Sequence, residues 1–439
     1  MLRSRPWFVL AVLTAVNFVN YVDRQMVYAL YPSLQQELFA HDPHANLKLG
    51  LLGTAMMVVH ALMTVPMGYA ADRFDRRRVI SVGVVGWSLG AALAGLAPGF
   101  GVLLIALGAI GVGEAAYGPA SNTILCEIYH EKDKARTVAI FNVGMFLGSA
   151  GGIALGGILG ASIGWRACFL VAAAPGVLLT VAVLAMRIQP VRTGGALTQH
   201  GMAREIWIMT REMFHIKSLR WALPGGVLIS FAAGGFVAWF VTFIVGLPPD
   251  IGFHGQSGTA STFVAGIAIL GGVCGVVVGG LVADRLQRHG PWGRAVTIAI
   301  GFFAATPCAY FTMFPTTRYG FLVAAFFTLF FIPWYNGPMA ALIDDVVPPE
   351  KAALAQASFM FVMHLLGTAP SSSVVGALAD RVGLPQAMLL PIGCAALAGV
   401  CYAMAARHVG ADMQRARIRR NSGQFVAPVA AAAPVELVG

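Results

Sequence analysis

The chain has 439 residues, of which 58% are hydrophobic and only 11% are charged, whereas a soluble domain is typically about 25% charged. With only 29 Lys and Arg and 19 Asp and Glu, the composition excludes a soluble enzyme, a disordered protein and a disulfide-rich secreted domain. It indicates an all-α polytopic membrane protein. The net charge of +10 does not indicate a nucleic-acid partner, because the basic residues lie between long apolar runs.

The six cysteines also fall in apolar stretches and show no CxxC spacing. Buried thiols explain this pattern, so we expect no metal site, no disulfide and no cofactor. Arg3 and Arg5 precede an apolar run as they do in a signal peptide, but no small-residue cleavage site follows that run. We therefore expect it to be retained as the first membrane helix.

Twelve stretches of mostly apolar residues are long enough to cross a bilayer core about 30 Å thick. In the first half they cover roughly 7–31, 48–70, 79–98, 100–127, 137–161 and 166–187. In the second half they cover roughly 219–246, 261–283, 294–314, 319–343, 352–378 and 385–406. The expected fold is therefore two six-helix bundles, 1–187 and 219–407.

The longest connection, 188–218, divides the chain near its middle. It carries an apolar stripe with alternating spacings of four and three residues, formed by Met202, Ile206, Met209, Met213 and Ile216. The spacing predicts an amphipathic helix that lies on the membrane surface. Residues 408–439 are first basic and then rich in Ala, Pro and Val, which predicts a disordered tail.

Basic residues are distributed unequally between the two sides of the membrane when alternate loops are assigned to each side. The side that holds both termini carries 24 of the 29 Lys and Arg residues. The opposite side carries Lys48, Arg166, Arg318 and Arg381, and Arg24 lies within a span. The positive-inside rule therefore predicts cytoplasmic termini, linker and tail, in a multi-pass protein of the cell membrane.

The two halves match each other at nearly constant offsets in residue number. A single offset relates Gly118–Pro119, Glu131–Lys132, Gly148 and Gly157 to Gly337–Pro338, Glu350–Lys351, Gly367 and Gly376. A slightly smaller offset relates GYAADRFDR at 68–76 to GLVADRLQR at 280–288. Such offsets predict a duplication. Many secondary transporters consist of two similar bundles that rock around a central site.

Several short motifs stand out against this background. The loop from Gly68 to Arg78 reads GxxxDRxxRRR, with Asp75 within it, and resembles the signature of the major facilitator superfamily, which usually has glycine at that position. The segments NYVDRQ (20–25), GVGEAAYGPAS (111–121) and GWRACF (164–169) are similar to the spinster-like branch. The resemblance covers 7–406 and implies a transporter, since that branch includes transporters of lysophospholipids and sphingosine-1-phosphate. Organic-anion and sugar-acid symporters share similar motifs.

The resemblance also implies a conformational latch in this loop and in its counterpart. The residues concerned are Gly68, Asp72, Arg73, Arg76, Asp284 and Arg285. A carboxylate at such a place can bind the positive N-terminal end of a neighbouring helix and stabilise one state of the protein. A plain topology signal is sufficient to explain Arg77 and Arg78.

Three charged residues lie well inside the predicted spans: Asp23, Arg24 and Glu114. Each costs about 2.5–3.5 kcal/mol near the bilayer centre, which favours a functional role. Arg24 suits a phosphate or carboxylate head group. The superfamily often has an arginine seven residues before this glutamate, but Leu107 stands there in this chain. We therefore expect Glu114 to lack a basic neighbour on its own helix. We interpret Glu114, or Asp23, as the proton-coupling site. A pairing of Glu114 with Arg24, or a structural Asp–Arg pair between helices, stays open.

The remaining candidate substrate-binding residues are polar or aromatic and lie in both halves. Helical spacing aligns Asn17, Asn20, Tyr21, Arg24 and Tyr28 on one stripe of the first span, which Tyr31 extends. The others are His60, Tyr117, Trp239, Phe240, Trp334, Tyr335, Asn336 and His364. One charged wall and one aromatic wall would fit an amphiphile with an anionic or zwitterionic head. Helix packing by the aromatic residues and a structural role for the histidines stay open.

We therefore expect a monomeric secondary transporter of a lysophospholipid-like or sphingolipid-like amphiphile, driven by protons and working by alternating access. The alternative is a proton-coupled organic-anion or sugar-acid symporter of the same fold. The chain contains no HExxH motif, and we expect no enzymatic activity.

Overall fold

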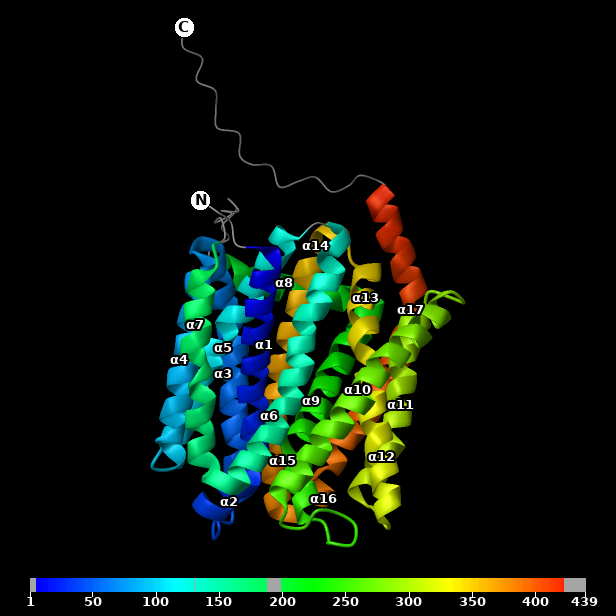
Figure 1. The fold of residues 1–439 in the computed structure, drawn as a ribbon. Coiled ribbons are helices and arrows are strands. Elements are labelled where there is room, and N and C mark those ends of the chain that lie inside the picture. Colours follow the sequence, from blue (N-terminus) through cyan, green and yellow to red (C-terminus); the bar gives the residue numbers. More distant parts are fainter. Residues whose placement is uncertain (1–4, 130, 188–198, 422–439) are drawn as a thin grey trace.

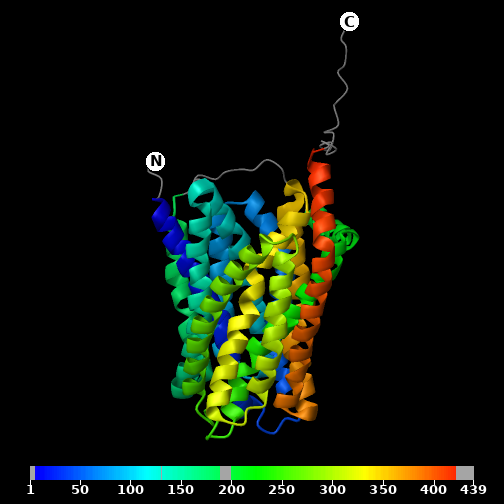
Figure 2. The ribbon, with the colours of Figure 1, turned by 90° about the vertical axis from the view of Figure 1, so that its right-hand side faces the viewer.

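The computed structural model describes residues 5–129, 131–187 and 199–421 and is helical throughout these ranges apart from short connections. The long helices lie side by side along one axis (Figures 1 and 2). Helix α1 begins and helix α17 ends at the same end of the bundle, here called the terminal end. Helices α2 and α16 lie at the opposite end, here called the distal end (Figure 1).

The first half contains α1 (Pro6–Ala29), α2 (Tyr31–Leu38), α3 (Ala45–Arg73), α4 (Arg76–Gly95), α5 (Phe100–Ile128), α6 (Glu131–Ala173) and α7 (Pro175–Ala185). The sequence did not predict α2. It begins directly after Leu30, where Pro32 occupies the first turn of a new helix, because proline is tolerated there and not inside a helix.

The second half follows α8 (Gln199–His215), which lies between the halves in sequence. Its long helices are α9 (Lys217–Gly246), α10 (Ser257–Gln287), α11 (Gly293–Met313) and α17 (Leu389–Asn421), with the short α16 (Leu384–Ala387) before the last. Two further stretches contain irregular turns: α12 (Arg318–Phe331), η1 (Ile332–Tyr335) and α13 (Asn336–Val346), then α14 (Pro349–Met363), η2 (His364–Thr368) and α15 (Ala369–Val382).

Eleven helical stretches among the described residues are long and apolar enough to cross a membrane. One of them, Ile140–Ala185, has 46 residues and contains two of the predicted spans. A continuous helix of that length would extend about 70 Å, more than twice a bilayer core of about 30 Å. The stretch is interrupted at Gly164, whose φ is 80° and ψ is 160°, and α7 then returns beside α4 and α1 (Figure 1).

The same backbone conformation occurs again in the second half. Gly383, which follows Gly164 at the offset that relates the repeated glycines, has φ 85° and ψ 155° and separates α15 from α16. This region of φ and ψ is essentially restricted to glycine. The two turns therefore add structural support to the duplication found in the sequence.

Replacing either turn glycine by alanine is expected to lower the free energy of unfolding by about 1–3 kcal/mol. An added Cβ at Gly164 would meet no atom within 4 Å, so the cost arises from the backbone conformation and not from a clash. Thermal unfolding of the purified Gly164→Ala and Gly383→Ala proteins measures it. The control is Gly266→Ala, an open site in the middle of α10, which should be neutral or stabilising.

Repeated glycines also make equivalent contacts in the two halves. A Cβ on Gly148 of α6 would collide with the carbonyl of Phe18 on α1, and one on Gly367 of η2 with that of Val227 on α9. Likewise Gly157 of α6 faces Ser261 of α10, in the other half, and Gly376 of α15 faces Asn46 of α3. Each repeat thus uses one glycine within its own half and one across the interface, as a duplication predicts.

A row of glycines on α6 sets the rotation of α1. The row has four-residue spacing, and an added Cβ would contact α1 along its length: Gly144 at Thr14, Gly148 at Phe18, Gly152 at Val22 and Gly156 at Met26. Small residues at such spacing let membrane helices approach backbone to backbone. With these α1 residues held against α6, the neighbouring stripe of α1 that carries Arg24 faces α3 and α5.

Helix α8 corrects one expectation. Met209 and Met213 of the predicted membrane-facing stripe are only 2% and 0% exposed, because they pack against the apolar core of the second half. The large apolar residues that α8 exposes are instead Trp207, Ile208 and Phe214. The side chain of Met202, and residues 188–198, lie outside the described part.

Helix α17 corrects a second expectation, since it continues to Asn421 where a tail was predicted from 408. Val409 is fully buried, and Asp412 accepts a hydrogen bond of 2.7 Å from the backbone N–H of Ser218 at the start of α9. These contacts hold the extension against the bundle. The rest of the predicted tail, 422–439, lies outside the described residues.

Candidate functional site

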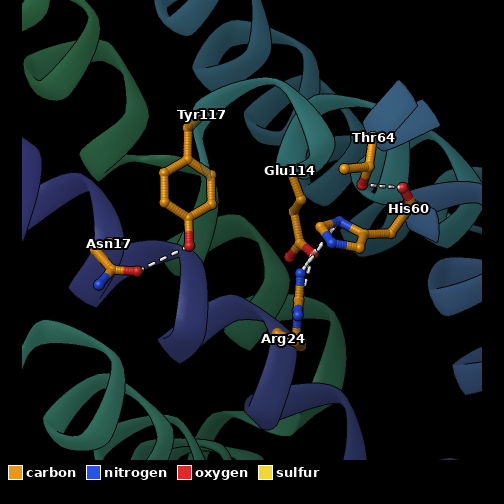
Figure 3. A network of polar contacts seen from close by, with 6 residues as sticks. All are labelled: Asn17, Arg24, His60, Thr64, Glu114 and Tyr117. Carbon is orange, nitrogen blue, oxygen red and sulfur yellow. Dashed lines mark hydrogen bonds and ion pairs between the residues drawn. The ribbon is translucent and has the colours of Figure 1, made fainter. Parts of the chain in front are cut away.

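A cavity of about 210 Å³ lies among α1, α3, α5 and α6. Its lining includes Asn17, Tyr21, Arg24, His60, Thr64, Glu114, Tyr117 and Asn142. All of these residues belong to the first half. Figure 3 shows the polar contacts that connect six of them.

An ion pair between α1 and α5 lies in this cavity. Arg24 places Nη2 2.6 Å and Nε 3.0 Å from the same oxygen of Glu114, Oε2. Glu114 is 1% exposed, and its other oxygen has no hydrogen-bond partner among the described residues. Glu114 therefore does have a basic neighbour, and of the two readings that the sequence left open the pairing with Arg24 is the one that forms. Leu107 supplies no cation from the same helix, but the packing of α1 on α6 brings Arg24 to this carboxylate.

His60 joins the ion pair from α3. Its Nδ1 lies 3.2 Å from Arg24 Nη2 (Figure 3). A guanidinium only donates hydrogen bonds, so Nδ1 is the acceptor and His60 is the neutral tautomer with its proton on Nε2. His60 Nδ1 is also 3.9 Å from Glu114 Oε2. Three helices thus contribute one cation, one anion and one neutral histidine to one site.

A second polar network adjoins the ion pair. The hydroxyl of Tyr117 donates to Asn17 Oδ1 at 2.8 Å, and Asn17 Nδ2 donates to the carbonyl of Phe141 at 2.7 Å. The Tyr117 ring packs edge-on against Trp87, with centroids 5.9 Å apart. These bonds tie α5 to α1 and α1 to α6, and they fix the wall beside Arg24.

Two predicted residues of α1 lie away from the cavity. Asn20 is fully buried and Asp23 is 4% exposed, on the face that also carries buried Val16 and Val27. Neither their side-chain oxygens nor the Asn20 nitrogen has a described hydrogen-bond partner. The predicted stripe therefore divides: Asn20 does not line the cavity, and the proposed Asp–Arg pair between helices does not form at Asp23.

The aromatic end of the stripe lies at the interface between the halves. Tyr28 is 6% exposed and packs edge-on against Tyr31, at 5.6 Å between centroids. Tyr31 contacts Trp239 of α9 at 5.2 Å. Trp239 is fully buried and donates from Nε1 to the carbonyl of Ser372, at 3.0 Å. Tyr31 and Trp239 therefore join the halves, and neither Tyr28 nor Trp239 lines the described cavity.

None of the other predicted residues of the second half is in the lining of this cavity. His364 is exposed, and Tyr335 packs against Phe302, with ring centroids 6.1 Å apart. The remaining three differ from the prediction: Phe240 is buried beside Phe236, Trp334 is buried against Phe330 and Phe331, and Asn336 donates to the carbonyl of Pro333. The aromatic wall is thus mostly helix packing, which the sequence interpretation had left open.

A π turn interrupts the helix that carries His364. It covers His364–Thr368, and His364 Nδ1 lies 3.3 Å from Thr368 Oγ1. Such turns are rare and occur frequently at functional sites. Helix propensity gives no signal for it, so the sequence could not have predicted this feature.

A hydrogen-bonded closure joins the halves at the distal end. Asp380 of α15 accepts three hydrogen bonds from the first turn of α3: Asn46 N at 3.0 Å, Asn46 Nδ2 at 2.9 Å and Leu47 N at 2.9 Å. The free N–H groups and the positive end of a helix dipole favour a carboxylate there. Asp380 was not among the predicted residues. The sequence feature that could have indicated its role is its position as an acidic residue at the end of a repeated span.

Further contacts between α3 and α15 extend this closure from the distal end toward the cavity. Thr54 Oγ1 donates to the carbonyl of Ala369 at 2.7 Å, and Ser372 Oγ donates to that of Gly50 at 2.8 Å. A Cβ on Gly50 would collide with the backbone of Ser372. The two halves therefore meet backbone to backbone between the cavity and the distal end.

The predicted latch residues lie at the terminal end. Arg76 donates to Glu127 of α5 at 2.6 Å, so it ties two helices of one half and does not connect the halves. Arg73 is exposed and stacks on Tyr69 at 5.2 Å. Asp284 and Arg285 are also exposed, and an added Cβ at Gly68 would meet open space. The side chain of Asp72 lies outside the described ones.

Asp75, which replaces the usual glycine of the signature, caps the N-terminus of α4. It has φ −60°, accepts from Arg77 N at 3.0 Å and pairs with the Arg77 side chain at 2.7 Å. The turn therefore needs no positive φ and no glycine. The hydrogen bonds from the Arg77 guanidinium lower the pKa of Asp75, so this cap persists in mildly acidic solution.

Repeated helical halves, an ion pair within a cavity among membrane-spanning helices and a closed distal end define a membrane transporter. A sequence model of the Major Facilitator Superfamily matches residues 13–369, and the chain belongs to that family. Within the family it is a transporter of the spinster branch and not an enzyme.

The relatives match over most of their length. Protein spinster homolog 3 of Danio rerio is 26% identical, over 97% of this chain and 90% of that protein. Protein spinster homolog 1 of Homo sapiens is 25% identical, over 94% of this chain and 83% of that protein. The crystal structure of a bacterial homologue of the human lysosomal transporter Spinster, inward-facing and occupied, has a TM-score of 0.76 at 20% identity and covers 93% of this chain and 99% of its own.

Proposed function

We propose that the protein transports an amphiphile with an anionic or zwitterionic head group, such as a lysophospholipid or a sphingolipid-like molecule, coupled to protons. The observation that carries this proposal is the Arg24–Glu114 ion pair with His60 beside it. A guanidinium suits a phosphate or carboxylate, and the spinster-like branch includes transporters of such lipids.

The ion pair couples the substrate to a proton by competition. When Glu114 is ionised, it occupies the Arg24 guanidinium through Nη2 and Nε. When Glu114 takes up a proton, Arg24 is left without its anion and binds the head group instead. Binding of the proton then raises the affinity of the protein for the substrate, and binding of the substrate raises its affinity for the proton by the same factor. The two cross the membrane together. Asp23, with two unpartnered buried oxygens, is a second candidate for proton uptake.

Alternating access follows from the distal closure. In the described state the halves are joined at the distal end by Asp380, Gly50 and Ser372. At the terminal end, Arg73, Asp284 and Arg285 are exposed. We propose that the opposite state opens the distal end and engages these residues as the latch at the terminal end.

The topology that we propose has twelve crossings, because Gly164 divides the 46-residue stretch into two. Two bundles, 1–187 and 219–407, are joined by the linker 188–218, and the termini are cytoplasmic because 24 of 29 basic residues lie on their side. The protein works as a monomer in the cell membrane.

Uptake by liposomes that contain the purified protein tests the substrate class. The substrates are lysophosphatidylcholine, lysophosphatidylethanolamine and gluconate, each with and without an imposed pH gradient. We expect both lysophospholipids to enter, faster with the gradient, and gluconate to enter little. A clear preference for gluconate would instead support the sugar-acid symporter.

A further inference from the structure

A second, apolar groove lies on the outer surface of the first half. It has a volume of about 520 Å³, within the range of ligand pockets, and is formed by α3, α4 and α5 near the terminal end. It uses Gly113 and Ala116 of α5, whereas the transport cavity uses Glu114 and Tyr117. The groove is therefore a separate site on another face of that helix.

Glycines create the groove. Gly83 of α4 and Gly113 of α5 touch backbone to backbone, since a Cβ on Gly83 would lie 2.7 Å from the Gly113 carbonyl. One turn along, Gly86 leaves open space: a Cβ there would meet a single atom, the Gly113 Cα at 3.7 Å. The two helices thus stay close at Gly83 while a channel remains over Gly86.

The groove opens toward lipid. Phe74 and Val82 on its rim are 67% and 72% exposed, which is expected of apolar side chains that face acyl chains. Its position beside the turn between α3 and α4 places it in the leaflet at the terminal end, which is the cytoplasmic leaflet in the proposed orientation. That leaflet carries the anionic lipids of a cell membrane.

One arginine at the mouth of the groove differs from its two neighbours in the sequence. Of three consecutive arginines, Arg76 pairs with Glu127 and Arg77 with Asp75. Arg78 lines the groove, is exposed and forms no ion pair with any described carboxylate. A comparable apolar groove between α1 and α6 has no charged residue in its lining. Of these two grooves, the one at Arg78 therefore combines an apolar channel with a cation that has no ion pair among the described residues.

We propose that this groove binds an anionic phospholipid, with one acyl chain over Gly86 and the head-group phosphate on Arg78. The lipid is a resident ligand of the outer surface and is distinct from the transported substrate. Its binding does not depend on the proposed transport function, because the groove and the cavity share no residue.

Native mass spectrometry of the detergent-purified protein tests the proposal, with dioleoylphosphatidylglycerol and dioleoylphosphatidylcholine as probes. We expect wild type to retain the anionic lipid about fivefold more tightly, the effect of one basic residue near an anionic head group. Arg78→Gln should remove this preference by weakening binding of the anionic lipid more than that of the neutral lipid. Gly86→Leu should fill the channel and weaken binding of both lipids.

Two matched variants control for charge and for helix stability. Arg288→Gln removes an exposed arginine at the same end of the second half, and Gly272→Leu adds the same side chain at an open site on α10. Both should keep the wild-type preference. Equal binding of the two lipids by wild type, or equal losses in Arg78→Gln and Arg288→Gln, would overturn the proposal. Thermal unfolding of each variant separates a lost site from a lost fold.

Discussion

The Glu114→Gln variant is expected to lose all stimulation of substrate uptake by a pH gradient while it still binds substrate. Glutamine can accept a hydrogen bond from Arg24 at the position of Glu114 Oε2, but it cannot take up and release a proton. Arg24 then stays available for the anionic head group at every pH. Uptake of lysophosphatidylcholine by proteoliposomes, with and without the gradient, measures the loss, and equilibrium binding of the same lipid shows that the site persists.

The matched control is Glu127→Gln on the same helix. Glu127 also forms an ion pair of 2.6 Å, with Arg76, but at the terminal end and outside the cavity. This variant should keep the stimulation by the gradient. Removing one member of a buried pair can cost about 3–5 kcal/mol, so both proteins should be compared by thermal unfolding. Undiminished stimulation in a folded Glu114→Gln protein would exclude Glu114 as the coupling residue.

The Asp380→Asn variant is expected to shift the protein away from the state closed at the distal end. Asp380 is the only described carboxylate that accepts from the backbone N–H groups of Asn46 and Leu47. Hydrogen bonds to a charged group contribute about 1.5–3 kcal/mol each. Losing the charge should therefore reduce the ratio of closed to open molecules at least about tenfold, since about 1.4 kcal/mol corresponds to a factor of ten.

Spin labels on the exposed distal residues Ala40 and Asp250, one in each half, measure this shift as a longer interlabel distance in a cysteine-free background. Asp42→Asn is the control, because Asp42 lies on the same side and its carboxylate accepts from His44 and Lys48 of its own half. It should leave the distance distribution unchanged. An identical distribution for Asp380→Asn and wild type would show that the carboxylate does not hold the distal end closed.

The fold could be predicted largely from hydrophobic runs and repeats, because membrane spans and duplicated motifs are local in sequence. The eleven candidate spans among the described residues overlap the predicted ones, and the repeat reappears in the matching turns at Gly164 and Gly383. The helix boundaries are less accurate. Pro32 starts an unpredicted α2, and α17 extends past residue 408 because Asp412 binds α9.

Only some of the residues predicted for the site lie in one cavity, and the sequence left the pairing of Glu114 with Arg24 open. Arg24, Glu114, His60, Tyr117 and Asn17 do lie together. Sequence spacing could not show that Arg24 would supply the cation that Leu107 does not, because this depends on how the α6 glycines rotate α1. For the same reason the helical stripe did not separate Asn20, which packs inside the bundle, from its neighbours on the cavity side.

Residues across the interface were the hardest to predict. Trp239 and Trp334 look alike as aromatic residues in apolar spans, yet Trp239 contacts Tyr31 of the other half and Trp334 packs within its own half. Asp380 lies outside the predicted spans, so its position did not single it out as a candidate. Its role depends on the contact between α15 and the start of α3. Contacts between distant segments decide these roles, and a single sequence does not contain them.

Simultaneous measurement of substrate and proton movement tests the central claim most directly. Proteoliposomes that enclose a pH-sensitive dye receive labelled lysophosphatidylcholine in the absence of any imposed gradient. If Arg24 and Glu114 couple the two ligands, substrate entry carries protons inward in wild type, and the Glu114→Gln protein shows entry without acidification. Substrate accumulation in wild type with no proton movement would contradict the account.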